Sequence, residues 1–325
     1  MDNKLYIITG GAGFIGSALV CRMVKDGYRV RVFDNQSRGS ASRLRDVKDK
    51  IDFIEGDIRD YGAVSRACQG AHCIIHLAFV NGTEYFYSQP DLVLDVGVKG
   101  MIHVMDTCRE HGIQELFLAS SSEVYQTPSV IPTDETVSLS IPDPTNPRYS
   151  YAAGKIISEM LALHCGQKYL NRVVIFRPHN VYGPDMGREH VIPQFIERMN
   201  PLCQSTKKTI LFPIQGSGEE TRAFIYIDDL IDGIMLLLKS GKHHQIYHIG
   251  TRDEISMEEL ARLVGRYFER EVKIVSSQPA KGGTKRRCPD ISKITQLGFT
   301  PKWSLSDGLN KTARWYTRAD HAGRN

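Results

Sequence analysis

Residues 4–16, KLYIITGGAGFIG, are the stretch of sequence that decides the fold. The apolar residues 5–8 suit a strand buried on both faces, and a run of glycines follows at once: Gly10, Gly11, Gly13 and Gly16. The residues after Gly16 have helical periodicity, so the glycine turn opens a helix. The unpaired N–H groups and the positive dipole end of that helix favour an anion, and a pyrophosphate fits there.

An acidic residue after the second expected strand supports this interpretation. The run from Tyr28 to Phe33 predicts a strand that ends in Asp34, one βα unit after the glycine turn. A carboxylate at this position can accept hydrogen bonds from both hydroxyls of an adenosine ribose. A tight turn that binds nothing would explain the glycines alone. The strand, the helix and the acid together predict a dinucleotide-binding site.

The bulk composition is that of an ordinary globular protein. Of 325 residues, 41% are apolar and 24% charged, and the net charge of +4 is spread along the chain. No apolar run is long enough to cross a membrane or to form a signal sequence, so we expect a cytoplasmic protein without a membrane partner. The seven cysteines form no CxxC pair, which indicates reduced thiols and no metal site. The dense basic run 281–287 suits a diphosphate or solvent as well as nucleic acid, so no nucleic-acid partner is predicted.

Strand-like runs alternate with helical segments along the first half of the chain. This alternation predicts an α/β fold, a doubly wound parallel sheet with ligands at the carboxyl ends of the strands. The further runs are 51–55, 73–78, 115–120 and 173–177. After Arg177, prolines break the chain into short pieces, which predicts a smaller C-terminal lobe. We expect one domain of residues 1–178, to which 223–249 return, and a lobe of residues 179–222 and 250–325.

A tyrosine and a lysine four residues apart, Tyr151 and Lys155, share one face of an expected helix. A phenol is a poor base at neutral pH, and lowering its pKa by about three units needs roughly 4 kcal/mol of preferential stabilisation of the phenolate. A fixed lysine beside a cationic nicotinamide can supply this. An exposed helix face would explain the spacing alone. Beside a dinucleotide fold and the hydroxyl-rich segment 120–125, the pair indicates catalysis.

The sequence resembles the extended short-chain dehydrogenase/reductase family in Asp34 and in a series of ordered motifs: TGGAGFIGS, GDIRD, HLA, SSSEVY, YAAGK, FRPHNVYGP, RAFIYIDD and RRCPDISK. It is most similar to the NAD-dependent branch of nucleotide-sugar epimerases, dehydratases and decarboxylases. The resemblance runs from Lys4 to about Tyr316. It implies a Rossmann sheet with a smaller α/β lobe that binds a nucleotide-diphosphate sugar, and it is specific to the branch rather than to one reaction.

The resemblance implies roles for individual residues. Tyr151 removes the proton from a sugar hydroxyl, usually at C4, while the nicotinamide takes the hydride; Lys155 holds the nicotinamide ribose and lowers the Tyr151 pKa, and Ser121 bonds the reacting oxygen. The implied NAD contacts are Gly10, Gly13, Phe14, Ile15, Gly16, Asp34, Asn35, Asp57, Ile58, Leu77, Ala78, Tyr151 and Lys155. The implied sugar-nucleotide contacts are Asn180, Val191, Arg222, Arg287 and Asp290.

The expected cofactor is NAD rather than NADP. The Asp34 carboxylate would lie close to the 2′-phosphate of NADP and carry the same sign of charge. Two nearby cations, Arg38 and Arg43, argue in the other direction.

The reaction that follows oxidation depends largely on Glu123. A carboxylate two residues after the catalytic hydroxyl resembles dehydratases, where it acts at C5 and C6, and also decarboxylases of nucleotide-linked uronic acids, where it works with an arginine such as Arg222. Simple 4-epimerases often lack it, and a surface glutamate that caps the loop is the plain alternative. We expect an epimerase or dehydratase, with a decarboxylase as the alternative. A non-catalytic dinucleotide-binding regulator is the second alternative, although such regulators generally lose the Tyr/Lys pair.

Three positions depart from the family pattern. Gly97 stands where asparagine is usual, Phe79 follows HLA where a small residue is usual, and Gln126 replaces a glycine. The first puts a helix kink in doubt, and the second reshapes the pocket beside the nicotinamide.

The resemblance also implies a homodimer. Two expected helices, 90–110 and 151–163, would pair with those of a second subunit in a four-helix bundle. They carry apolar residues on more than one face: Val93, Val96, Met101, Met105, Ile156, Ile157 and Met160. Packing of all these residues against their own sheet is the alternative.

Overall fold

The structure is a computed structural model that describes residues 4–204, 208–278 and 284–318. Residues 1–3, 205–207, 279–283 and 319–325 lie outside the described residues, and so does the first part of the basic run at 281–287.

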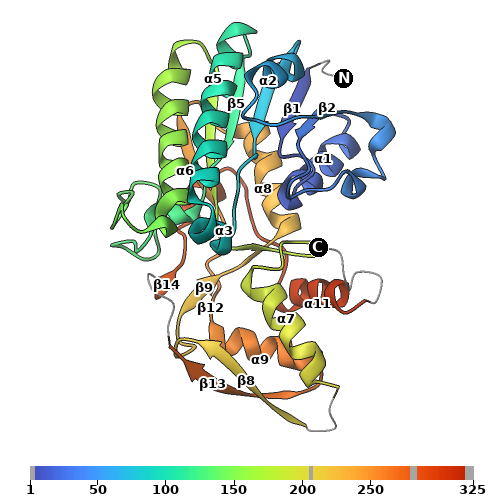
Figure 1. The fold of residues 1–325 in the computed structure, drawn as a ribbon, viewed down its shortest axis with the longest axis vertical. Coiled ribbons are helices and arrows are strands. Elements are labelled where there is room, and N and C mark those ends of the chain that lie inside the picture. The colour runs from blue at the N-terminus through green and yellow to red at the C-terminus, as the bar shows by residue number, and fades with distance from the viewer. Residues whose placement is uncertain (1–3, 205–207, 279–283, 319–325) are drawn as a thin grey trace.

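A seven-stranded parallel sheet forms the centre of the larger domain (Figure 1). Its order is β11-β6-β5-β4-β1-β2-β3, and each neighbouring pair is parallel. The strands are β1 (Leu5–Thr9), β2 (Arg29–Asp34), β3 (Ile51–Glu55), β4 (Cys73–His76), β5 (Glu115–Ala119), β6 (Arg172–Pro178) and β11 (Gln245–Ile249). The order reverses between β1 and β4, and a doubly wound sheet has its ligand crevice at the carboxyl ends of such strands. The predicted fold class is confirmed.

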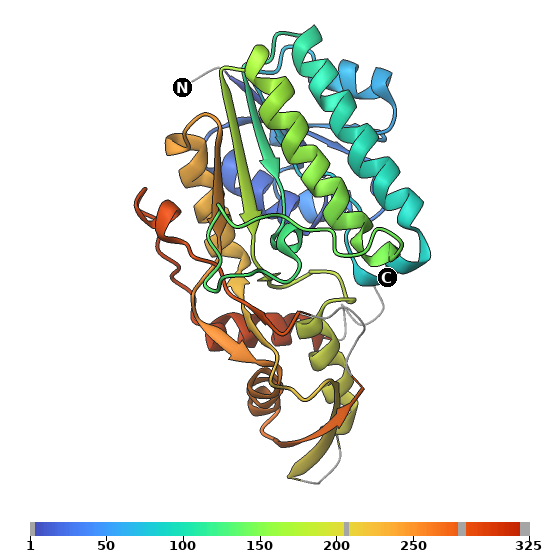
Figure 2. The ribbon, with the colours of Figure 1, turned by 90° about the vertical axis from the view of Figure 1, so that its left-hand side faces the viewer.

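Helices cover both faces of this sheet. One face packs on α1 (Phe14–Lys25) and α8 (Ile227–Ser240), the other on α2 (Tyr61–Cys68), α5 (Gly100–Glu110) and α6 (Ser150–Met160). Figure 2 shows α5 and α6 side by side over the sheet. Strand residues alternate between two apolar clusters: Ile8 packs with the first set of helices and Ile7 with the second, and both are fully buried. Burial on both faces explains why the first strand is a continuous apolar run.

The smaller lobe lies below the carboxyl ends of the sheet in Figure 1. Its short strands form three small sheets. These strands are β7 (Val181–Tyr182), β8 (Thr209–Gln215), β9 (Thr221–Ala223), β10 (Ile225–Tyr226), β12 (Glu254–Ser256), β13 (Glu271–Ser277) and β14 (Arg286–Arg287). The helices are α7 (Val191–Leu202), α9 (Met257–Tyr267), α10 (Ser292–Thr295) and α11 (Leu305–Tyr316). Strand β9 pairs with both β12 and β14, which brings Arg222 beside Arg287.

The expected helix 90–110 is helical throughout, but it is not a regular α-helix along its whole length. It consists of α4 (Pro90–Leu94), a π-helical turn (Asp95–Lys99) and α5, and a short helix α3 (Thr83–Ser88) precedes it. The expected helix 151–163 is regular only to Met160 and then widens into a second π-helical turn, Leu161–Cys165. Wide turns of this kind are common at functional sites. The irregular turn thus forms even though Gly97 stands where asparagine was expected.

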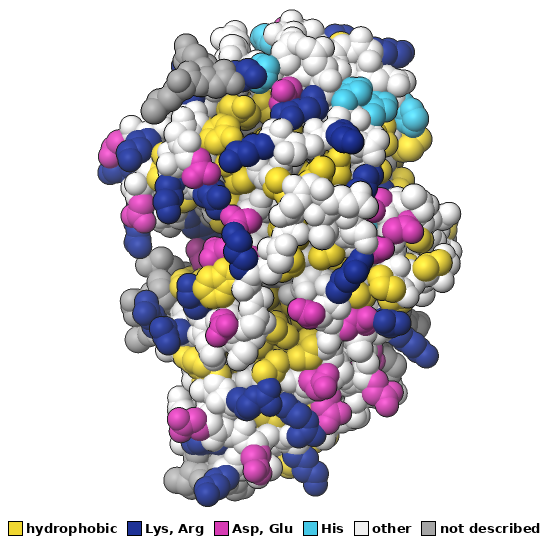
Figure 3. All heavy atoms as spheres, turned by 180° about the vertical axis from the view of Figure 1, so that it is seen from behind, with side chains coloured by type: hydrophobic (Ala, Val, Ile, Leu, Met, Phe, Trp, Pro, Cys, Tyr) yellow, Lys and Arg dark blue, Asp and Glu magenta, His cyan; other side chains and the backbone are white. Residues whose placement is uncertain are grey.

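The outer surface carries both signs of charge. On the face turned away in Figure 1, Lys and Arg side chains are interspersed with Asp and Glu rather than gathered in one patch (Figure 3). Across the described ranges, every helix is too short or too polar to cross a bilayer.

Candidate active site

The glycine turn after β1 leaves no room for side chains. Gly10 has a φ of +70°, and an added Cβ would lie 2.8 Å from the backbone nitrogen of Ala78. A Cβ on Gly16 would lie 2.1 Å from the carbonyl oxygen of Gly10. No side chain caps the helix that begins at Phe14, so the N–H groups of its first turn remain free to bind an anion at the pocket that they line.

The acid at the end of β2 is fixed by the same turn. Asp34 is 8% exposed, its Oδ2 accepts from the backbone nitrogen of Ala12 at 2.9 Å, and its Oδ1 accepts from that of Gln36 at 2.7 Å. A carboxylate has about four lone-pair sites, so two remain for ribose hydroxyls.

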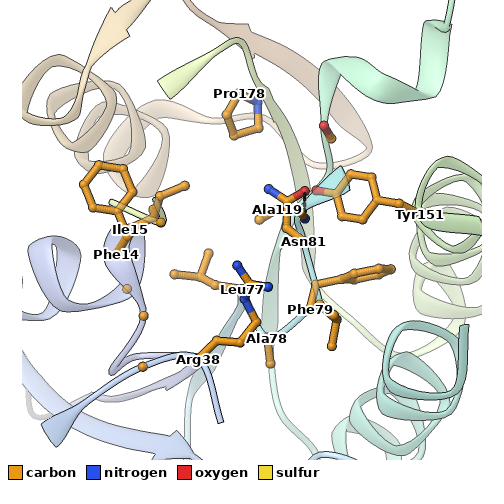
Figure 4. A pocket seen from close by; sticks show the side chains of 18 of the residues that line it. Phe14, Ile15, Arg38, Leu77, Ala78, Phe79, Asn81, Ala119, Tyr151 and Pro178 are labelled. Atoms are coloured by element: carbon orange, nitrogen blue, oxygen red, sulfur yellow. Dashed lines mark hydrogen bonds between the residues drawn. The ribbon is translucent and has the colours of Figure 1, made fainter. Parts of the chain in front are cut away.

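One pocket of about 420 Å³ joins these elements to the catalytic pair. Figure 4 shows Phe14 and Ile15 on one side of it and Phe79 and Tyr151 on the other. The predicted site residues that line the pocket are Gly10, Gly13, Phe14, Ile15, Gly16, Asp34, Asn35, Ile58, Leu77, Ala78, Ser121, Glu123, Tyr151, Lys155, Asn180 and Arg287.

Tyr151 and Lys155 are held in a closely packed wall of this pocket. The Tyr151 ring stacks on Phe86, with 5.0 Å between centroids, and its hydroxyl is hydrogen-bonded to Ser121. The Lys155 ammonium donates to the carbonyl oxygen of Ala119 at 2.6 Å. Tyrosine and lysine are 7% and 3% exposed, so neither side chain has freedom to leave this geometry.

Burial opposes the charged form of both groups. It raises the pKa of Tyr151 well above its ordinary value, against a smaller opposite effect of the Ser121 hydrogen bond. It lowers the pKa of Lys155 to about 7, against the opposite effect of Glu159 one turn later. The phenolate therefore needs positive charge close by in order to form.

Glu123 lines the part of the pocket where the resemblance implies that the sugar binds. It lies in a short 3₁₀ turn, Ser122–Tyr125, in which the Ser121 hydroxyl accepts from the backbone nitrogen of Glu123 at 3.1 Å. The Nη1 atom of Arg287 donates to Oε1 of Glu123 at 2.5 Å. Burial raises the pKa of Glu123, but the charge and hydrogen bond of Arg287 outweigh it and hold that pKa below its usual range. Glu123 is thus an ion-paired carboxylate rather than a surface cap.

Arg222, the arginine expected to work with Glu123, does not line the pocket. Its guanidinium donates to the carbonyl oxygens of Thr221 and Thr284, each at 2.7 Å. Burial first, and then the neighbouring Arg287, lower the pKa of Arg222 to about 10. It contributes charge to the site, whereas Arg287 makes the direct contact.

Four predicted site residues do not line the pocket: Asp57, Val191, Arg222 and Asp290. Asp57 is bound by Arg59 at 2.8 Å and by Asn35 at 3.1 Å, and the Arg59 hydrogen bond is the main cause that lowers its pKa to about 2. Asp290 pairs with Arg252 and accepts from the backbone nitrogen of Ser292.

Two ion pairs near the part of the pocket expected to bind the cofactor were not predicted from the sequence. Arg43 donates to both carboxylate oxygens of Asp185, at 2.7 and 3.0 Å, and Arg38 pairs with Glu189. These acids come from the segment after β7, far from both arginines in sequence. The arginines that argued for NADP are therefore already paired with carboxylates.

The departures from the family pattern have structural explanations. Gln126 takes a left-handed φ of 52°, the conformation that favours glycine, and its side-chain amide donates to the carbonyl oxygen of Glu123 at 2.7 Å. The Phe79 ring fills the space beside Gly97 and Gly154. No sequence signal connected Phe79 with Gly97 and Gly154, because these residues are distant along the chain.

A glycine turn at a helix N-terminus, a buried carboxylate and a Ser/Tyr/Lys constellation line one pocket, the combination that is typical of short-chain dehydrogenases. The family model described as "NAD dependent epimerase/dehydratase family" matches residues 6–250. The chain belongs to this family and is an NAD-dependent enzyme.

Three relatives represent three reactions. UDP-glucuronic acid decarboxylase 1 of Xenopus tropicalis is 31% identical, over 98% of this chain and 73% of its own length. The structure of a dTDP-glucose 4,6-dehydratase of Streptomyces venezuelae with NAD bound has a TM-score of 0.84 and 31% identity, over 96% of each chain. That of the Thermotoga maritima UDP-glucose 4-epimerase with UDP-glucose has a TM-score of 0.82 and 28% identity, over 96% of this chain and 98% of the other. Overall similarity therefore does not separate the reactions.

Proposed function

We propose that this protein oxidises a nucleotide-diphosphate sugar at C4 and then epimerises or dehydrates it. The observation that carries the proposal is a single pocket in which Ser121, Tyr151 and Lys155 stand with the glycine turn on one side and the Glu123–Arg287 pair on the other. A dinucleotide and a sugar that must meet at one carbon would need this arrangement.

NAD fits the residues at the cofactor end. A Cβ at Gly10 or Gly16 would fill the space beside the glycine turn. The N-terminus of α1, which no side chain caps, faces this space. Asp34 would accept the ribose hydroxyls, and Lys155 would hold the nicotinamide ribose. When bound, NAD supplies the acceptor for the hydride that leaves the sugar.

Tyr151 would take the proton from the C4 hydroxyl, and Ser121 would hold the reacting oxygen through the hydroxyl that already bonds the phenol. Burial lowers the pKa of Lys155 to about 7, so the ammonium, whose charge favours the phenolate, becomes less populated as the pH rises. Glu123 would then act as the acid or base for the later step, released from Arg287 or assisted by it.

A specific observation favours a second candidate, decarboxylation of a nucleotide-linked uronic acid. Glu123 is bound by Arg287, and the charges of Arg148 and Arg222 act on the same carboxylate. Three guanidinium groups around one carboxylate leave an excess of positive charge. This excess suits a sugar carboxylate as well as a diphosphate.

A panel of UDP-, GDP-, CDP- and dTDP-linked sugars and uronic acids, with mass spectrometry of the products, tests these candidates. An epimer keeps the mass of its substrate and separates only by chromatography, a dehydration product lacks one water, and a decarboxylation product lacks carbon dioxide. If no member of the panel reacts although NAD is bound, the protein is the non-catalytic dinucleotide-binding regulator instead.

We also propose a cytoplasmic homodimer that pairs α4, α5 and α6 with those of a second copy. The seven cysteines are free thiols, which suits a reducing compartment. Val93, Val96, Met101 and Met105 are buried in the protein's own core, so they are unavailable for an interface. Exposed apolar side chains on these helices remain: Leu94, Ile102, Ile157 and Met160. Light scattering at micromolar concentration should give a dimer, and Met160→Glu should give a monomer; a wild-type monomer would contradict the proposal.

A further inference from the structure

The Phe79 ring is wedged between two helical segments that both carry glycine at the point of contact. A Cβ on Gly97, in the π-helical turn before α5, would lie 2.2 Å from Cζ of Phe79. A Cβ on Gly154, in α6, would lie 2.9 Å from the same atom. Both distances are shorter than real Cβ contacts. The ring can occupy this position only because both residues are glycine.

The wedged ring touches both members of the catalytic pair. The ammonium nitrogen of Lys155 lies 4.1 Å from the ring centroid of Phe79, over its face. The ring of Tyr151 meets that of Phe79 edge to face, with 5.1 Å between centroids and 80° between planes. Figure 4 shows Phe79 beside Tyr151 at the pocket wall. An aromatic face attracts a cation most strongly where water is excluded, and Lys155 is almost fully buried.

We propose that Phe79 is a positioning residue of this active site, whose ring face holds the Lys155 ammonium and whose edge-to-face contact with Tyr151 orients the phenol. The ammonium has three donors, and one of them is directed at the carbonyl oxygen of Ala119. The aromatic face replaces part of the hydration that burial removes. The inference deepens the proposed function, on which its catalytic consequence rests.

The ring should keep Lys155 protonated at a higher pH than burial alone would allow. The other ionisable groups around the ammonium are Tyr151 and Glu159 on the same helix and His76 on β4. Burial and the charge of Lys155 lower the pKa of His76 to about 3, so the imidazole is neutral throughout the pH range of the test. Loss of the aromatic face disfavours the ammonium and should lower the Lys155 pKa. The catalytic defect should therefore grow as pH rises from about 6 to 8.

The direct test follows the ¹³Cε resonance of Lys155 in the NAD-bound enzyme with labelled lysine, assigned by its absence in Lys155→Arg. Phe79→Leu keeps much of the volume and removes the aromatic face. Its titration midpoint should fall by about one pH unit. In Phe79→3,5-difluorophenylalanine, which keeps the shape and weakens the ring quadrupole, the midpoint should fall by a smaller amount in the same direction. An unchanged midpoint in both variants would overturn the proposal.

A second measurement separates positioning from simple packing. Phe79→Leu should lower kcat about tenfold with little change in KM, while the fluorinated variant should lose rate without losing thermal stability. Gly97→Ala should strongly lower the melting temperature of the wild type but cost much less in a Phe79→Ala background, because the clashing atom is gone. If Gly97→Ala lowered the melting temperature equally with and without the Phe79 ring, the proposed close contact between Phe79 and Gly97 would be excluded.

The titration and the melting cycle need no sugar substrate. If no sugar nucleotide ever reduces the cofactor while the Lys155 midpoint still moves, the proposed function fails and the role of Phe79 stands. If the cofactor is reduced and the midpoint does not move, the role of Phe79 fails and the proposed function stands.

Discussion

The two ends of the pocket differ in the chemical groups that line them. At the end expected to bind the cofactor, the glycine turn, the first N–H groups of α1 and Asp34 line the pocket, and all of these lie within the first 34 residues. At the end expected to bind the sugar, the charged side chains of Glu123 and Arg287 line the pocket, and Arg222 behind them adds its charge. A site made of backbone tolerates little change, whereas a site made of side chains can be rebuilt for another reaction. This difference explains how one family carries out several reactions with one cofactor.

The largest expected effect falls on Tyr151, where the two ends meet. Tyr151→Phe removes the proton acceptor, so the rate of cofactor reduction should fall by about 10²- to 10⁴-fold while affinity for the sugar nucleotide changes little. Stopped-flow absorbance of the reduced nicotinamide measures it. The neighbouring Tyr149→Phe is the matched control, because Tyr149 does not line the pocket, and it should react at the wild-type rate.

Glu123→Gln tests the sugar end alone. The amide keeps the shape but cannot take a proton, so cofactor reduction should persist while product formation slows by about 10²-fold or more. Rapid-quench mass spectrometry should then detect a 4-keto sugar that accumulates. Turnover within a few-fold of wild type would instead identify an epimerase in which Glu123 has no role. If carbon dioxide is released from a uronic acid, and this release is lost in both Glu123→Gln and Arg222→Met, the enzyme is the decarboxylase.

Gly16→Ala tests the rigidity of the cofactor end. Its Cβ would lie 2.1 Å from a backbone oxygen, so the turn must shift, and NAD affinity should fall by about tenfold or more, since such overpacking costs roughly 1–3 kcal/mol. Calorimetry measures it. Gly27→Ala is the control, because Gly27 has a positive φ of 85° but no atom within 4 Å of its Cβ position, so the substitution strains the backbone without a steric clash. It should lower stability and leave NAD affinity unchanged.

The smallest expected effect concerns the choice between NAD and NADP. Wild-type protein should bind NAD more tightly, because Asp34 repels a 2′-phosphate and the nearby arginines are paired. Asp185→Asn removes the carboxylate that Arg43 binds through two hydrogen bonds. It should lower the ratio of NAD affinity to NADP affinity a few-fold. Asp46→Asn, at an exposed pair with Arg45, should leave it unchanged. Tighter binding of NADP by the wild type would refute the role of Asp34.

What could be predicted from the sequence follows the same division. The glycine turn, Asp34 and the Tyr151–Lys155 spacing are local patterns, since the residues concerned are neighbours on one strand, turn or helix. The structure brings these predicted residues to one pocket.

The remaining contacts join positions that no local pattern connects. The partner of Glu123 was expected to be Arg222, but β14 brings Arg287 closer, 164 residues away in sequence. The pairs Arg43–Asp185 and Arg38–Glu189 and the Phe79–Gly97 contact likewise depend on tertiary packing. The wide turn within the helix 90–110 has no signal in the apolar periodicity, which continues through it, and Gly97 put the kink known from the family pattern in doubt.

The central claim is that the pocket oxidises C4 of a sugar with Tyr151 as the base. The most direct measurement compares a reactive nucleotide sugar with its C4-deuterated form and follows the absorbance of the reduced nicotinamide in a single turnover. Deuterium at C4 should slow that signal severalfold and appear in the reduced cofactor, and Tyr151→Phe should slow the signal by about 10²-fold or more with either substrate. Deuterium that stays on the sugar, or an unchanged rate in Tyr151→Phe, would contradict the claim.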